Sequence, residues 1–337
     1  MENYVFICYN CYIWGCLILI YFDFFKCNQT ELIVSFCQYF NVEISAAKEY
    51  FDTVNPEELD AEMVIDAFSI KLNDYDSHQV YLLCRHMSTT NEPGIESYKK
   101  NGILDLKRML KGENKLTATM HKFGYTIDYD KKLLTVGDKK YNLEIPSDKC
   151  KNCIKGKPIV CGSNFGCELK DKLKALAMKL YYYDATTEFF ISGYLEDMKQ
   201  YTTISRSPEI LYTLDEIGEE SCERYSPEYS MCFDWTKNNS ICIVIEFIVS
   251  LADMETFKPI SKEYWLRDYR RCLYMSGYND SDFWNETIPK QVFDNFDLIR
   301  KFISKYYWGC NEEYGSLLPD KYVKPEQIRK IEKFKRI

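Results

Sequence analysis

The apolar residues of the chain follow two periods, and the shorter one predicts strands. The run SICIVIEFIVSLADM, at 240–254, is rich in β-branched residues and long enough for a central strand. Within it, period-two alternation favours a solvent-facing Glu246 at a sheet edge over a buried functional carboxylate. Further strand-like runs lie at 80–86, 125–129, 133–136, 141–145 and 188–194.

The longer period predicts helices. One helix is indicated by leucines at helical spacing: Leu169, Leu173, Leu176 and Leu180. A second is predicted to end at Gly102 in the left-handed conformation. In a third, Asn55 is expected to cap the helix with Pro56 at its first position. Further helical patterns cover 207–221, 261–277 and 288–309, and the tryptophans beside them are expected in the core: Trp235, Trp265, Trp284 and Trp308.

These elements predict an α+β protein without regular βαβ alternation or internal repeats. Residues 1–75 are expected to form an N-terminal helical layer, followed by a polar linker at 73–79. Residues 76–337 are expected to form a catalytic-like α+β domain with a Cys-rich insertion at 148–168. The predicted sheet is mixed, mostly antiparallel and split, with helices flanking it.

The N-terminal run 4–22 is uncharged and long enough to span a bilayer. Asn10 and several aromatic residues with polar tips dilute it, and Glu2 stands where a signal peptide has positive charge. A buried helix or strand in a cytoplasmic protein is therefore favoured over a membrane anchor.

Charge and cysteine content narrow the function classes. The net charge of −8 and the pI near 5.2 argue against sequence-independent binding to duplex nucleic acid. The C-terminal segment 324–337 is locally basic, and a solvated face of a closing helix or strand is favoured over a nucleic-acid contact. The 15 cysteines are odd in number and scattered, which indicates free thiols in a reducing compartment.

One cysteine group has metal-ligand character. Cys150 and Cys153 form a CxxC knuckle, and Cys161 and Cys167 follow in a glycine-containing segment. Four thiolates would hold a structural zinc ion, because no coordination position would remain open for water. Free cysteines in a flexible loop are the alternative.

His86 is the last residue of the predicted strand 80–86 and is one of only 3 histidines. A histidine at such a position commonly makes one structural hydrogen bond. The hydroxyl groups of Ser88 and Thr89, followed by Thr90, make a binding role worth testing.

Near the other end of the chain, Glu312 and Glu313 enter a short strand-like segment. They form either an exposed acidic turn before an edge strand or a carboxylate pair that points into a cleft.

Taken together, RHMSTTNEPGIESYKKNGI at 85–103 and EEYGSLLPDKYVKPEQIRKI at 312–331 resemble the two ends of ADP-ribosyltransferase catalytic domains. Members of that superfamily commonly start on a strand ending in His followed by Ser or Thr, and finish with a glutamate on a strand. Met87 stands where many members have glycine. The resemblance covers only these two separated segments.

The resemblance implies an enzyme that cleaves NAD and transfers ADP-ribose to a protein or nucleic-acid acceptor, as toxins and defence effectors do. It implies that His86, with Ser88 or Thr89, contacts the ribose and diphosphate side of NAD. Arg85 either contacts phosphate or, as the strand neighbour of His86, points away from it. Tyr183 or Tyr141 would stack on nicotinamide. Glu313 or Glu312 would hold the ribose 2′-hydroxyl and stabilise the developing positive charge. A non-enzymatic, zinc-stabilised interaction protein and a membrane-tethered protein are the alternative hypotheses.

Overall fold

The computed structural model describes residues 12–14, 17–26, 28–144, 168–181, 186–196, 207–221, 230–255, 277, 288–309 and 312–334. These residues form an α+β protein with a mainly antiparallel sheet, a small second sheet and N-terminal helices, as the sequence predicts. Contacts divide the chain into two compact units. The first contains 1–85, 189–194 and 247–318, and the second contains 86–188, 195–246 and 319–337.

Within the described segments the main sheet has 7 strands: β1 (Tyr12–Trp14), β2 (Leu17–Phe22), β3 (Val80–Thr90), β7 (Glu188–Ser192), β8 (Ile241–Ser250), β9 (Glu313–Ser316) and β10 (Ile328–Phe334). Their order is β1-β2-β3-β7-β9, and β8 pairs with both β3 and β10. β2 runs parallel to β3, whereas β1 is antiparallel to β2 and β7 is antiparallel to β3. The boundary between the two units falls inside β3, between Arg85 and His86.

β8 forms where its apolar run predicts a strand, and β3 begins at Val80 as predicted but continues beyond His86 to Thr90. β8 is almost continuously buried, which suits a strand with neighbours on both sides. Glu246 is half-buried between the buried Ile245 and Phe247. Because β8 pairs on both sides, the expected edge position of Glu246 is wrong.

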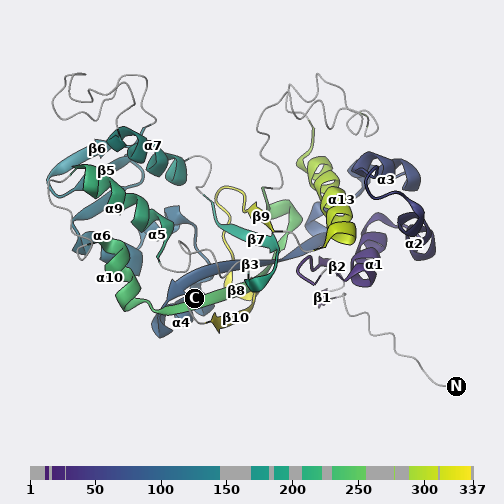
Figure 1. Cartoon of the computed structure of the whole chain (residues 1–337), viewed down its shortest axis with the longest axis horizontal. Helices are drawn as coiled ribbons and strands as arrows, with labels where there is room; N and C mark the ends of the chain where they lie inside the picture. The colour runs from purple at the N-terminus through teal and green to yellow at the C-terminus, as the bar shows by residue number, and fades with distance from the viewer. Residues whose placement is uncertain are drawn as a thin grey trace. The chain divides into compact units, whose positions relative to one another are not determined.

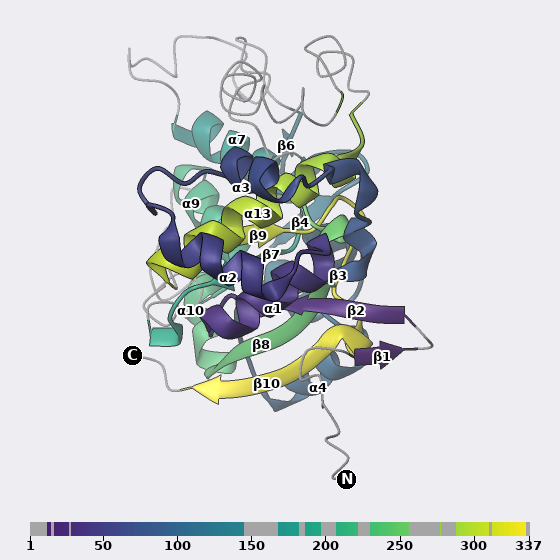
Figure 2. The same cartoon turned by 90° about the vertical axis from the view of Figure 1, so that its right-hand side faces the viewer.

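The first unit contains the N-terminal helices α1 (Gln29–Phe40), α2 (Ile44–Thr53) and α3 (Ala61–Phe68), together with α13 (Lys290–Trp308) (Figure 2). Their core is aromatic: the ring centroids of Phe36 and Phe302 lie 4.5 Å apart, and Phe51 meets Phe302 at 5.1 Å. Such ring pairs stabilise a core beyond their buried area. The short turns η1 (Leu72–Asp74), η2 (Ser77–Gln79) and η5 (Leu251–Asp253) also belong to this unit.

The second unit contains a three-stranded sheet of β4 (Tyr125–Asp128), β5 (Leu133–Val136) and β6 (Lys139–Asn142). The Gly137-Asp138 turn joins β5 and β6. Figure 1 shows α7 (Glu168–Tyr181) and α9 (Glu209–Ser221) beside this sheet. This unit also contains α4 (Glu92–Asn101), α5 (Leu106–Lys111), α6 (Lys115–Lys122), α10 (Met231–Asn238) and η6 (Pro325–Gln327). The predicted leucine stripe of α7 contributes the buried Leu173, Leu176 and Leu180 to the core.

Gly102 ends α4 as predicted, with a positive φ of 78°, but its ψ of −162° differs from the left-handed conformation that was expected. The next residue, Ile103, exchanges backbone hydrogen bonds with Val323. A Cβ atom on Gly102 would come within 1.9 Å of the Val323 carbonyl oxygen. Glycine is therefore needed here for close approach as well as for conformation.

Several local predictions differ from the structure. The Asn55 side chain accepts a hydrogen bond from the Glu57 amide and so caps a turn, not the helix. Helix α3 begins only at Ala61, with Asp60 as its N-cap, because the Asp60 side chain accepts from the Met63 amide. Of the two forms expected for the basic tail, helix or strand, its described part contains strand β10, which pairs with β8. Trp235 is buried as predicted, whereas Trp308 is half-exposed at the end of α13. Trp265, Trp284 and the predicted helix 261–277 lie outside the described residues except for Gly277.

The described part of the apolar run 4–22 forms the strands β1 and β2. Ile20 and Phe22 are buried, as expected for a strand in the interior of a folded protein. None of the helices in the described segments is long and apolar enough to cross a membrane.

Candidate functional site

His86 lies in β3 and is half-buried. Its Nδ1 atom lies 2.9 Å from the backbone carbonyl oxygen of Glu188. Because a carbonyl can only accept, Nδ1 carries the proton, and in the neutral ring Nε2 is left as an acceptor. Burial lowers the pKa of His86 below its usual value, and the bond to Glu188 only partly opposes this. The ring is therefore neutral near pH 7, with one nitrogen fixed by the backbone.

Ser88 is two residues beyond His86, so both side chains emerge on one face of β3. The Ser88 hydroxyl lies 2.9 Å from the hydroxyl of Tyr98, which α4 supplies. Burial raises the pKa of Tyr98, and this phenol stays protonated in the neutral range. Sequence reasoning did not single out Tyr98; its place in the helix that directly follows β3 was the available signal.

Thr89 and Arg85 emerge on the opposite face of β3 from His86. Thr89 is buried, and its hydroxyl oxygen accepts a 3.0 Å hydrogen bond from the indole nitrogen of Trp235. The guanidinium carbon of Arg85 lies 4.1 Å from the ring centroid of Phe25. The strand pleat thus keeps Ser88, and not Thr89 or Arg85, on the side of the histidine.

Glu313, at the start of β9, is held by two lysines of α13. Its Oε1 lies 2.7 Å from the ammonium nitrogen of Lys301, and its Oε2 lies 3.3 Å from that of Lys305. Burial raises the pKa of Glu313, but the two lysines outweigh it and hold the pKa below its usual value. Glu313 is therefore a carboxylate at neutral pH. Glu312 is exposed and accepts a 3.0 Å hydrogen bond from the Tyr314 hydroxyl.

Glu313 belongs to the first unit and His86 to the second, and each is described within its own unit. Tyr141 is fully buried in the core of the second unit, so its ring has no free face for a ligand. Tyr183 and the predicted zinc ligands Cys150, Cys153, Cys161 and Cys167 lie outside the described residues. Over the described ranges, no group of three or more His, Cys, Asp or Glu side chains could hold a metal ion.

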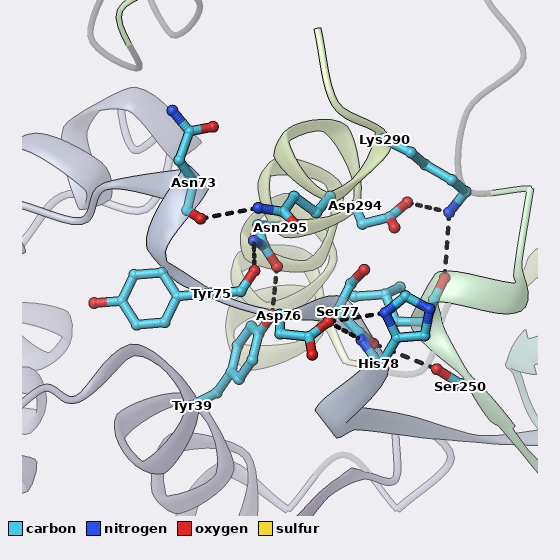
Figure 3. Close-up of polar contacts among 12 residues, drawn as sticks. Tyr39, Asn73, Tyr75, Asp76, Ser77, His78, Ser250, Lys290, Asp294 and Asn295 are labelled. Carbon is cyan, nitrogen blue, oxygen red and sulfur yellow. Dashed lines mark hydrogen bonds and ion pairs between the residues drawn. The ribbon is translucent and has the colours of Figure 1, made fainter.

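A second polar site of the first unit surrounds Asn295 (Figure 3). Its amide nitrogen donates to the carbonyl oxygens of Leu72 and Tyr75, each at 2.8 Å. Its amide oxygen accepts from the Tyr39 hydroxyl at 2.6 Å. The fully buried Asn295 thereby joins α13 to α1 and to the chain that leads into β3.

Figure 3 also shows Asp76 and His78 on the turn before β3. Asp76 accepts from the His78 amide at 3.0 Å, and its carboxylate lies 2.8 Å from the His78 ring nitrogen Nδ1. These bonds lower the pKa of Asp76, the one to the backbone amide most strongly. Both side chains are exposed, and Asp76 caps η2. The sequence marked this segment only as a polar linker, although the DSH spacing typical of an Asx turn was present.

The chain matches no protein-family model, no curated protein and no solved structure.

Proposed function

We propose that the chain is an ADP-ribosyltransferase-like enzyme that cleaves NAD at the bond between nicotinamide and ribose. The observation that carries the proposal is the orientation of His86. The Glu188 carbonyl fixes the proton on Nδ1, which leaves Nε2 as a hydrogen-bond acceptor on a half-buried strand. A ribose hydroxyl is a donor that such a nitrogen can bind.

The charge of Glu313 also supports this proposal. When the bond between ribose C1′ and nicotinamide breaks, its electron pair leaves with nicotinamide and positive charge develops on the ribose. A carboxylate stabilises that charge and can accept from the 2′-hydroxyl. The acceptor oxygen or nitrogen then bonds to C1′ and releases its proton. Glu313 has the ionised form that these roles need, because Lys301 and Lys305 lower its pKa.

The proposal assigns the remaining roles by the same chemistry. Ser88 and Tyr98 supply hydroxyl groups on the histidine side of β3. A protein, a nucleic acid or water would serve as acceptor. The described cysteines are free thiols, which suits the proposed cytoplasmic location: Cys37, Cys84, Cys232 and Cys242.

A second candidate function is a non-enzymatic interaction protein, with zinc in the cysteine segment as its proposed stabilising ion. One observation favours it. Both carboxylate oxygens of Glu313 already have lysine partners, an arrangement that a purely structural ion-pair network also produces.

Nicotinamide release from NAD by the purified full chain separates the two functions. His86→Asn is the informative variant, because the shorter amide can keep a donor toward the Glu188 carbonyl while removing the acceptor at the Nε2 position. We expect wild type to release nicotinamide and His86→Asn to lose at least about tenfold in kcat/KM, the value of one hydrogen bond of about 1.4 kcal/mol.

Glu96→Gln is the matched control, since Glu96 is exposed on α4 and pairs only with Lys99 among the described residues. Its activity should equal that of wild type. Absence of nicotinamide release by wild type would refute the enzyme proposal and favour the interaction protein. Equal activity of wild type and His86→Asn would remove His86 from the site.

A further inference from the structure

One side of α13 carries charged residues that are buried. Asp297, Lys301 and Lys305 follow one another at intervals of four residues, so they share one face of the helix. Their side chains are 1%, 5% and 1% exposed. Charged side chains are rarely so deeply buried unless they are paired, because desolvation costs several kcal/mol for each ion.

Every charge in this row has a partner at short distance. The ammonium nitrogen of Lys301 lies 2.7 Å from Asp297 Oδ2 and 2.7 Å from Glu313 Oε1. Lys305 contacts the other oxygen of Glu313, and Arg300 contacts the other oxygen of Asp297 at 3.0 Å. The contacts therefore form a continuous chain from Arg300 through Asp297 and Lys301 to Glu313 and Lys305.

Within this row of ion pairs, each oxygen of the Glu313 carboxylate is contacted by a different lysine, and the two lysines lie on successive turns of one helix. A single ion pair leaves a carboxylate free to rotate about its last bond, whereas two lysines on different oxygens fix that rotation. Each carboxylate oxygen has a second acceptor position. The Glu313 side chain is 23% exposed, so it retains a surface for a further donor.

The two lysines differ in how strongly their surroundings stabilise the protonated form. Burial lowers the pKa of Lys301, but Asp297 and Glu313 outweigh it and raise the pKa above its usual value. Burial also lowers the pKa of Lys305, and the positive charges of Lys301 and Arg300 add to this, so Glu313 compensates only in part. Lys301 is therefore firmly protonated, and Lys305 holds its proton less strongly. The distances agree, because the ammonium nitrogen of Lys301 lies 2.7 Å from a Glu313 oxygen and that of Lys305 lies 3.3 Å from the other.

We infer that Lys301 and Lys305 are positioning residues that hold the Glu313 carboxylate in one orientation, with Lys301 itself fixed by Asp297. The catalytic meaning of this inference rests on the proposed function, in which Glu313 acts on the ribose. The lysines need not touch substrate in this role. They set the direction and the ionisation of the carboxylate that does.

The test is the titration of the Glu313 carboxyl group in the full chain, followed by NMR of ¹³C-labelled glutamate and assigned by comparison with Glu313→Gln. Among the residues that the structure describes, the charged groups in contact with it are Lys301 and Lys305, with Asp297 and Arg300 behind Lys301. In Lys301→Met we expect the midpoint to rise by about one pH unit or more, a tenfold change in the ionisation constant. Lys305→Met should raise it by a smaller amount, and Lys301→Arg should restore it.

A Glu313 midpoint that is unchanged in folded Lys301→Met would overturn the inference. Should that variant fail to fold, Lys305→Met decides, because an unchanged midpoint there would overturn it equally. The pH profile of nicotinamide release gives the catalytic readout: its acid limb should move to higher pH in Lys301→Met by the same amount. A shifted titration without nicotinamide release by wild type would refute the proposed function and leave the positioning role intact.

Discussion

Helix α13 carries two buried polar sites of opposite kind. Around Asn295, neutral groups meet one another, and the asparagine amide makes three hydrogen bonds. Around Glu313, two carboxylates and two lysines meet in the buried part of the cluster. Both sites connect α13 to distant parts of the sequence, the first to α1 and the chain before β3, the second to β9.

The two sites differ in what happens when one member is lost. A neutral hydrogen-bonded site loses the bonds of the missing group and leaves its partners unsatisfied. A buried charged site loses the compensation for its other charges, which then remain desolvated without a counterion. The neutral site fixes how the first unit is assembled, whereas the charged site also fixes the protonation of a group at the protein surface.

The largest expected effect comes from Glu313→Ala. It removes the carboxylate that contacts both buried lysines and leaves Asp297 as an acidic partner of Lys301, and removing one partner of a buried ion pair costs about 3–5 kcal/mol. Urea unfolding of the variant and wild type at neutral pH measures this loss. Glu312→Ala is the matched control, because Glu312 is exposed, and it should change stability by less than about 0.5 kcal/mol. A similar small loss in both variants would show that the lysines are compensated elsewhere.

Asn295→Leu should have the second largest effect, a loss of about 2–3 kcal/mol, because it leaves the carbonyls of Leu72 and Tyr75 and the Tyr39 hydroxyl without their partner. Tyr39→Phe removes only one of the three bonds and should cost about 1 kcal/mol. The same urea experiment compares them. Equal losses in the two variants would contradict the assignment of Asn295 as the centre of this site.

The smallest expected loss of stability involves His86 and occurs only at acidic pH. Because its pKa is lowered in the folded protein, the unfolded chain binds the proton more readily. The stability contributed by neutral His86 is therefore complete above the usual pKa of 6.5 and is lost as the pH falls through the lowered value. Urea unfolding between about pH 7.5 and about pH 5 should show a larger loss for wild type than for His86→Asn. Parallel pH dependence in the two proteins would contradict the buried, neutral histidine.

Much of the fold was predictable because it depends on local pattern. The strand starting at Val80, the central strand β8, the leucine stripe of α7 and the long helix α13 all follow from periodicity in the sequence. Glycine at position 102 was predictable as a helix stop. Its second role, the close approach of Val323, was not, since that contact joins positions distant in sequence.

The candidate site was predictable only in its residue types. His86 and Ser88 share a face by strand alternation, which the sequence implies once β3 is accepted. The sequence left the basic tail open between helix and strand, and the pairing with β8 shows that residues 328–334 form a strand.

The sequence by itself determined the α+β class, the position of the main strands and helices, and the residues that could carry chemistry. The tertiary structure alone decided their partners: Glu188 for His86, Tyr98 for Ser88, and Lys301 for Glu313. The physical reason is the distance along the sequence over which each effect acts. Periodicity and capping act within a few residues, whereas the tautomer of a histidine and the charge of a buried carboxylate depend on groups brought beside them by folding.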